Sequence, residues 1–171
     1  MKVNYILLIS IAIITFGFKG CQAMLAFPEK SFTTKTGKAY TISLAQTDDE
    51  KEMVKIFLEK RFEKILYTPQ HQDLCIYLSK KDSSKRLIAA AHFLHPTEER
   101  SYLFLSDMAV RSKYQNEGIG STILSYLIEH TEYPIQLFSL TGAIDFYKKL
   151  GFYSYDQKMP AKMRREPSFN S

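Results

Sequence analysis

The stretch from Leu103 to His130 constrains the fold more than any other part of the chain. Residues 103–110 are apolar enough for a buried strand. A turn with the spacing Gln-x-x-Gly-x-Gly follows, at Gln115, Gly118 and Gly120. Beyond the turn, apolar residues recur at helical spacing and give one apolar face: Ile119, Ile123, Leu124, Leu127 and Ile128. The sequence therefore predicts a strand that runs through a glycine loop into a helix.

A loop of this kind is a ready site for a phosphate or pyrophosphate. Backbone N–H groups at a helix start have no partner within the helix, and the positive end of the helix dipole lies behind them. Glycine lets the backbone approach a ligand and tolerates positive φ. An ordinary tight strand-to-helix turn is the alternative. Two known phosphate loops are excluded, because the dinucleotide fingerprint requires a glycine where Gln115 stands and the Walker loop requires a lysine before Ser121.

Composition narrows the classes of protein further. The 171-residue length fits one domain of ordinary size, with 45% hydrophobic and 24% charged residues. The formal net charge of +5 suits a small anionic ligand. No basic stripe with interleaved aromatic residues is present, so we expect no nucleic-acid partner. His92 and His95 would point to opposite faces of a strand, so we expect no metal site. The sequence indicates no oligomeric state.

Residues 1–22 form a separate segment. Lys2 gives a positive start, an apolar run from Tyr5 to Phe18 has about the length of a signal h-region, and Cys21 follows. The segment resembles a bacterial lipoprotein signal, although Phe18 and Lys19 depart from that pattern. A cleaved lipoprotein signal and an uncleaved anchor both predict a membrane-associated protein. The alternative is that Met24 is the true first residue, in which case the protein would be cytoplasmic.

Residues 23–37 read as a linker, because Pro28 and mixed charges interrupt any period, and a single domain is expected over residues 38–171. Its first strand is expected at residues 38–45. Thr47 and Glu50 then form a capping box for a helix that should end by Tyr67, since Pro69 disfavours helix at the residue before it. A loop at 67–73 and a hairpin of strands 74–78 and 87–94 complete the first half.

The second half is expected to alternate strands and helices after the glycine loop. A strand is predicted at residues 135–140, and Thr141 can cap a last helix that ends at Gly151. A closing strand is predicted at 152–155, and residues 159–165 can add a weak edge strand. This order of elements predicts an α/β (α+β) fold whose mixed sheet is antiparallel first and crosses over later.

Two of these segments resemble the motifs of one family. Residues 110–120 resemble the acyl-CoA-binding motif of GNAT-type N-acetyltransferases, and residues 143–152 are similar to that family's second motif, a helix with a tyrosine that ends in Gly-Phe. The resemblance covers roughly Lys38 to the C-terminus. It implies a mostly antiparallel mixed sheet flanked by helices, acetyl-CoA as cosubstrate without a metal, and transfer of the acetyl group to a primary amine by direct attack.

The resemblance also implies a set of cofactor-binding residues. The end of the strand, Met108 to Val110, would bond the pantetheine amides. The loop amides would hold the pyrophosphate: Gln115, Asn116, Glu117, Gly118, Ile119, Gly120 and Ser121. Arg111 and Lys113 either meet the phosphates of CoA or form a solvated pair. Leu140 stands where many members have an asparagine, so Ser139 or Thr141 would have to substitute for it.

Two residues are candidates for the proton transfers. Asp107 can accept a proton from the amine, directly or through water, or it is a carboxylate at a strand end. Tyr147 matches the family tyrosine that protonates the leaving thiolate, or it is a core aromatic residue of an amphipathic helix. Tyr67, His71 and Asp73 are candidates for lining the acceptor site. A second function stays open beside the enzyme, namely a catalytically silent, membrane-tethered GNAT-like CoA-binding module.

Overall fold

The computed structural model describes residues 27–34, 36–62, 71–78 and 86–167, and for residues 71–78 it describes the backbone only. Within these ranges no helix is both long enough and apolar enough to cross a membrane. The signal or anchor expected at residues 1–22 lies outside the described residues, so membrane attachment stays a prediction. Tyr67 lies outside them as well, and nothing is described of the side chains of His71 and Asp73.

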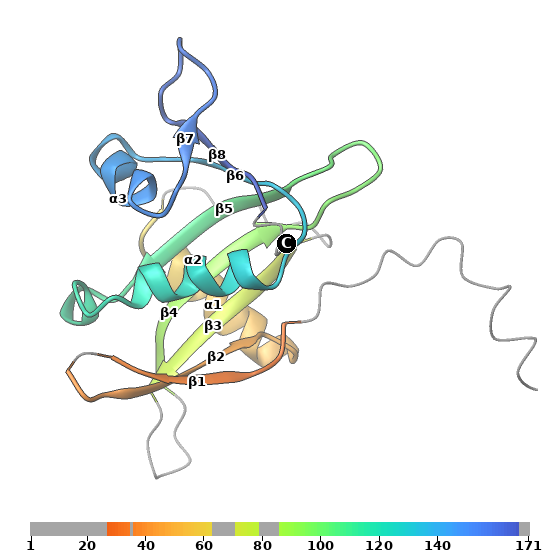
Figure 1. Cartoon of the computed structure of the whole chain (residues 1–171). Coiled ribbons are helices and arrows are strands. Elements are labelled where there is room, and N and C mark those ends of the chain that lie inside the picture. Colours follow the sequence, from red (N-terminus) through yellow and green to blue (C-terminus); the bar gives the residue numbers. More distant parts are fainter. Residues whose placement is uncertain (1–26, 35, 63–70, 79–85, 168–171) are drawn as a thin grey trace, which may run out of the picture.

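The fold is an eight-stranded mixed sheet flanked by helices, as the sequence predicts (Figure 1). The strands lie in the order β1-β2-β3-β4-β5-β6-β8-β7, and all neighbours are antiparallel except β5 and β6. Their bounds are β1 Lys30–Thr33, β2 Ala39–Leu44, β3 His71–Leu78, β4 Arg86–Leu94, β5 Leu103–Val110, β6 Ile135–Phe138, β7 Tyr153–Ser154 and β8 Lys162–Arg165. The helices are α1 Asp48–Glu59, α2 Ile119–Glu129 and α3 Ile144–Lys148, with 3-10 turns at Ser112–Tyr114 and Thr141–Ala143.

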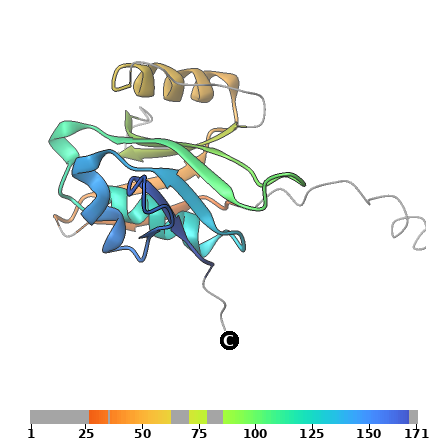
Figure 2. The ribbon, with the colours of Figure 1, turned by 90° about the horizontal axis from the view of Figure 1, so that it is seen from above.

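The sheet separates two helical layers. Helices α1 and α2 lie on opposite faces of it (Figure 2). The larger core cluster joins α2 to β2, β4, β5 and β6 through side chains such as Ile123, Leu105 and Leu137. The smaller cluster joins α1 to the sheet through Val54, Phe57, Leu58, Leu87 and Ala90. Strand β5 therefore packs against both clusters, with Leu103 and Leu105 on the α2 face and Ala109 on the α1 face, which explains its nearly continuous apolar sequence.

Helix α1 starts as the sequence predicts and ends earlier. The Thr47 side chain accepts from the N–H of Glu50 at 3.2 Å and the Glu50 carboxylate accepts in return, which confirms the capping box. The expected end at Tyr67 is wrong, because the helix ends at Glu59. The N–H groups of Arg61 and Phe62 both donate to the Leu58 carbonyl, so the chain turns there and Phe62 packs against the smaller core cluster.

The expected linker at residues 23–37 contains strand β1, which pairs with β2 from Lys30 to Thr33. Phe27 is also buried, with its ring centroid 5.5 Å from that of Phe93. The packed part of the described chain therefore begins at Phe27 rather than near Gly37. The sequence does not indicate β1, because the strand is short and Phe32 is its one large apolar side chain, so no alternation is visible.

Three other segments differ from expectation. Strand β8 lies between β6 and β7, so it is not an edge strand, and only Met163 of it is buried. The expected loop at 67–73 is shortened, because β3 begins at His71. Thr141 begins a 3-10 turn and makes no side-chain cap, although Gly151 ends the last helical turn with φ +82° as expected.

Candidate active site

The site is formed where β5 and β6 separate. The two parallel strands pair only from Leu103 to Leu105 on β5, while β5 continues to Val110. On its other side β5 stays paired with β4, and the N–H of Arg111 donates to the Ile88 carbonyl at 2.9 Å. Because bonding alternates along an antiparallel ladder, the N–H and C=O groups of Met108 and Val110 then point away from β4. The groups of Met108 and the N–H of Val110 face the open edge, where an extended ligand can pair with them, while the Val110 carbonyl accepts from Gln115 Nε2 at 3.3 Å.

The glycine loop connects this open edge to the start of α2. After the 3-10 turn, Asn116 and Gly118 adopt positive φ, at +64° and +84°. The first helical bond runs from the N–H of Thr122 to the Gly118 carbonyl at 3.0 Å. The N–H groups of Ile119, Gly120 and Ser121 therefore have no hydrogen-bond partner among the described residues. No side chain caps the helix, so these N–H groups are open to an anion.

The two glycines of the loop are required for different reasons. Gly118 has open space around it, and its positive φ is a conformation that L side chains rarely adopt. Gly120 has an ordinary φ, but a Cβ there would lie 3.3 Å from the Phe146 ring and 3.9 Å from Met108 Cε. The start of α2 thus packs directly against α3, the helix that carries Tyr147.

Tyr147 is a half-buried phenol on α3 that packs against the larger core cluster. Its ring centroid lies 5.1 Å from that of Phe146 and 5.7 Å from that of Phe152. Burial raises its pKa to about 12, so the phenol stays protonated at neutral pH. Its hydroxyl bonds no other residue in the described part of the chain, and the proton is available to a ligand.

Asp107 lies on the opposite face of the sheet from Met108. Alternation places its side chain with Ala109, which packs against the α1 cluster, whereas Met108 and Val110 pack against the α2 cluster. Asp107 stands opposite the buried His92, beside a bulge that inserts Ser106 into β5. Burial raises the pKa of the Asp107 carboxyl, and His92 partly offsets that effect. A carboxyl with a raised pKa at this position is suited to accept a proton.

Of the two basic candidates, Arg111 directs its charge away from the loop amides. The Arg111 Nε donates to the Leu87 carbonyl at 2.7 Å, and its guanidinium lies 5.2 Å from the centre of the Phe57 ring. Both partners belong to the α1 cluster, so the structure places this charge on the face opposite α2. Lys113 is exposed and lies 4.8 Å from the centre of the Tyr114 ring.

Glu117 has a role that the sequence did not reveal. Its carboxylate points away from the open amides and accepts hydrogen bonds from Lys38 Nζ at 2.5 Å, Tyr40 Oη at 2.7 Å and Thr36 Oγ1 at 3.4 Å. The Lys38 ammonium, with help from Tyr40, lowers the pKa of this carboxyl. An acidic residue within an anion-binding loop is thereby neutralised, and it fastens the loop to the β1–β2 hairpin.

For acetyl-CoA, the cosubstrate that the sequence predicts, we expect Glu117→Gln to raise the KM several-fold while kcat changes little, because the amide loses the ion pair that holds the loop. Glu129→Gln is the matched control, since Glu129 also pairs with a lysine of the hairpin, Lys30, but at the far end of α2. Steady-state kinetics on both variants measures the difference. Equal KM values for acetyl-CoA in the two variants would contradict the role of Glu117.

The same variant should change the response of stability to acid. The carboxyl of Glu117 has a lowered pKa in the folded protein, so its contribution is complete above its unfolded pKa and is lost as the pH falls through the folded one. The wild-type melting temperature should therefore fall more steeply at low pH than that of Glu117→Gln.

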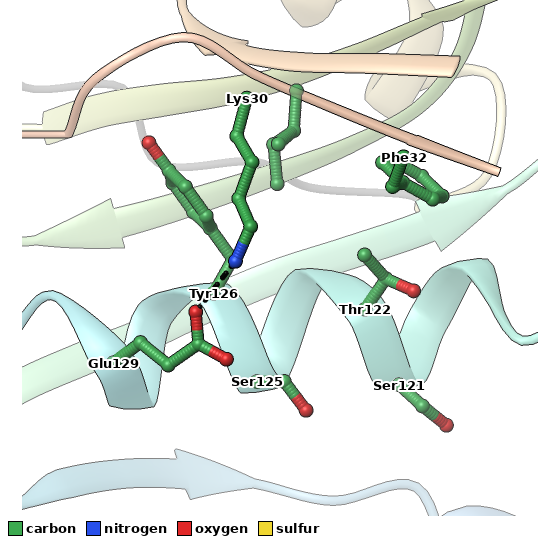
Figure 3. Close-up of a pocket in the computed structure, with 8 residues that line it drawn as sticks. Lys30, Phe32, Ser121, Thr122, Ser125, Tyr126 and Glu129 are labelled. Carbon is green, nitrogen blue, oxygen red and sulfur yellow. Dashed lines mark hydrogen bonds and ion pairs between the residues drawn. The ribbon is translucent and has the colours of Figure 1, made fainter. Parts of the chain in front are cut away.

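A groove of about 180 Å³ lies between the β1–β2 hairpin and α2 (Figure 3). Lys30 and Glu129 bridge it at 2.8 Å, and Phe32, Thr122 and Tyr126 line it as well. Ser121, at the start of α2, also lines the groove, whereas Tyr147 and Asp107 do not. No cluster of potential metal ligands occurs within the described ranges.

Part of the chain is similar to a known domain. Residues 72–154 match the family model described as an acetyltransferase (GNAT) domain. A comparison with curated protein sequences finds no match. An acyl-CoA N-acyltransferase from Pseudomonas aeruginosa is similar in structure, with a TM-score of 0.58, 15% identity, and coverage of 74% of this chain and 99% of that one.

Two further solved structures are similar in fold to this chain. Tetrahymena GCN5 has a TM-score of 0.56 at 13% identity, covering 76% of this chain and 99% of its own. AtaTR, solved with bound acetyl-CoA, has a TM-score of 0.56 at 15% identity, covering 74% and 92%. The mixed α+β fold described above is thus the GNAT fold, and residues 72–154 match its acetyltransferase domain.

Proposed function

We propose that this chain is an acetyl-CoA-dependent N-acetyltransferase that transfers the acetyl group to a primary amine by direct attack. The observation that carries the proposal is that backbone groups at the start of α2 and at the edge of β5 are both open to a ligand and are joined by the glycine loop. The free N–H groups at the start of α2 suit a pyrophosphate, and the open edge of β5 that leads away from them suits the amides of a pantetheine arm. Tyr147 follows Phe146, whose ring lies against Gly120 at the start of α2. The family match and acetyl-CoA in a neighbour of the same fold support the proposal.

The residues divide the reaction between them. The loop and β5 hold the thioester, which converts the attack into an effectively intramolecular step. The amine nitrogen attacks the thioester carbonyl, the C–N bond forms and the C–S bond breaks. The proton that the amine loses goes to Asp107, directly or through water, and the leaving thiolate takes the proton of the Tyr147 hydroxyl. The backbone amides contribute affinity and orientation, while the two side chains move the protons.

The test uses the full chain with acetyl-CoA and a panel of amines. Acetyl-CoA should raise the melting temperature, by an amount that corresponds to about 2.7 kcal/mol at a concentration 100-fold above Kd. An amine in the panel should release CoA. A thermal shift without CoA release from any amine would favour a silent CoA-binding module, and the absence of any shift at millimolar acetyl-CoA would reject both functions.

Asp107→Asn should lower kcat/KM for the amine by about 10²-fold or more, because the amide cannot accept the proton. Burial raises the pKa of Asp107, so the wild-type rate should rise with pH through an acid limb that lies above the pKa of an exposed aspartate. That limb should be missing in the variant. The exposed Asp48 of α1 provides the control Asp48→Asn, which should keep the wild-type pH profile. An unchanged acid limb in Asp107→Asn would assign the base elsewhere.

A further inference from the structure

One face of the C-terminal half of the sheet carries exposed aromatic side chains beside the open edge. Leu103 and Leu105 of β5 point into the α2 core, so Phe104 between them points to the other face. Ile135 and Leu137 of β6 point into the same core, so Gln136 and Phe138 also face away from it. This is the face on which Asp107 lies. Helix α1 contacts β3, β4 and β5. Strands β6, β8 and β7 lie beyond the part of the sheet that α1 contacts (Figure 1).

The rings on this face form a small cluster, which we call the aromatic face: Phe104, Phe138 and Tyr155. The Phe104 and Phe138 rings meet edge to face with centroids 5.7 Å apart. The Tyr155 hydroxyl donates to Gln136 Oε1 at 3.3 Å, which brings the third ring onto the same surface. Phe138 is 58% exposed and Tyr155 is 44% exposed, so the rings keep a large area open to a ligand.

The charged groups beside the aromatic face are already paired. Lys162 Nζ lies 2.9 Å from an oxygen of Asp156, and Arg164 Nε lies 2.7 Å from an oxygen of Glu166. These pairs leave neither carboxylate free to bind a second ammonium group. Among the described residues, a ligand with several positive charges therefore finds only Asp107 as an unpaired acidic group here, whereas an apolar ring can pack against Phe138 and Tyr155.

The position of the aromatic face relates it to the transfer step. The pairing of β5 with β6 ends at Leu105 and Leu137, and Phe138 is the next residue of β6. Asp107 directly follows the inserted Ser106 on β5. A ligand ring bound against Phe138 thus needs only a short linker to reach the point where the strands separate. The Asp107 carboxyl, which would take the proton, lies near the same point.

Resting on the proposed function, we propose that the acceptor is a primary amine joined by a short linker to an aromatic ring, with that ring bound on the aromatic face. The amine then reaches the thioester at the separation of β5 and β6. Phe138 acts as the specificity residue, because it is the most exposed ring of the cluster and the nearest to the separation along β6. Polyamines are disfavoured acceptors, since apart from Asp107 the acidic groups near the aromatic face, Asp156 and Glu166, already have cationic partners.

The experiment compares three probe amines at saturating acetyl-CoA: phenethylamine, ethylamine and spermidine. Phenethylamine should have the highest kcat/KM. Phe138→Ala should lower kcat/KM for phenethylamine about 10-fold, mainly through KM, and leave the value for ethylamine unchanged, since ethylamine has no ring to bind. Tyr133→Ala is the matched control, because Tyr133 is an exposed aromatic residue that precedes β6, and it should behave as wild type.

The outcomes separate this proposal from the one on which it rests. CoA release with spermidine or ethylamine as the better acceptor would overturn the aromatic acceptor and keep the acetyltransferase. An equal loss for phenethylamine and ethylamine in Phe138→Ala would also overturn it, because the residue would then serve structure alone. If no amine releases CoA, the proposed function fails and the acceptor proposal fails with it.

Discussion

Gly118→Glu should abolish the rise in melting temperature that acetyl-CoA gives the wild type. The carboxylate would stand at the N-cap of α2, where it can occupy the free N–H groups of Ile119 to Ser121 and repel an incoming pyrophosphate. Each charge-assisted bond to such an amide contributes about 1.5–3 kcal/mol, so the loss of two of them lowers the affinity at least about 100-fold. Thermal shift and calorimetric titration with acetyl-CoA measure this loss.

Two control variants separate charge from backbone strain. Gly118→Ala carries the same unfavourable φ of +84° without the charge, so it should lower stability and keep a measurable shift with acetyl-CoA. Gly142→Glu adds the charge at a glycine with no atom near its Cβ position and no positive φ, and it should bind as wild type. If Gly118→Glu keeps the full acetyl-CoA shift, the pyrophosphate is not bound at these amides.

The sequence predicted those parts of the fold whose signal is local. Residues 103–110 form β5 as predicted, and the capping box at Thr47 starts α1. The sequence does not reveal β1 or the central position of β8, because each strand packs a single large apolar side chain, Phe32 or Met163, against the core. Tertiary pairing of this kind leaves little periodicity to read.

The same distinction applies to the candidate site. The positive φ of Gly118 and the open amides after it follow from the local motif, so the sequence located the loop. The partners of Glu117 are the side chains of Thr36, Lys38 and Tyr40, which are about 80 positions away in sequence, with separations of 81, 79 and 77. The contacts of Arg111 with Phe57 and Leu87 likewise join residues that are distant in the sequence. Only the folded chain brings these groups together, and no spacing in the sequence encodes the direction of a side chain.

Tyr147→Phe should lower kcat about 10²-fold or more while the KM for acetyl-CoA stays close to the wild-type value. Phenylalanine keeps the ring that packs against Phe146 and Phe152, so α3 and its contact with Gly120 persist. What is lost is the proton for the leaving thiolate. Tyr153→Phe is the control, since Tyr153 is a surface residue whose hydroxyl donates to Glu166, and its kcat should not change.

The pH dependence of the wild type tests the same assignment. Burial raises the pKa of Tyr147 to about 12, so the hydroxyl can donate throughout the neutral range, and it should cause no fall in kcat below about pH 11. A fall at lower pH that persists in Tyr147→Phe would belong to another group. Wild-type kcat in Tyr147→Phe would instead show that Tyr147 serves the core alone, and that the thiolate leaves without a protein acid.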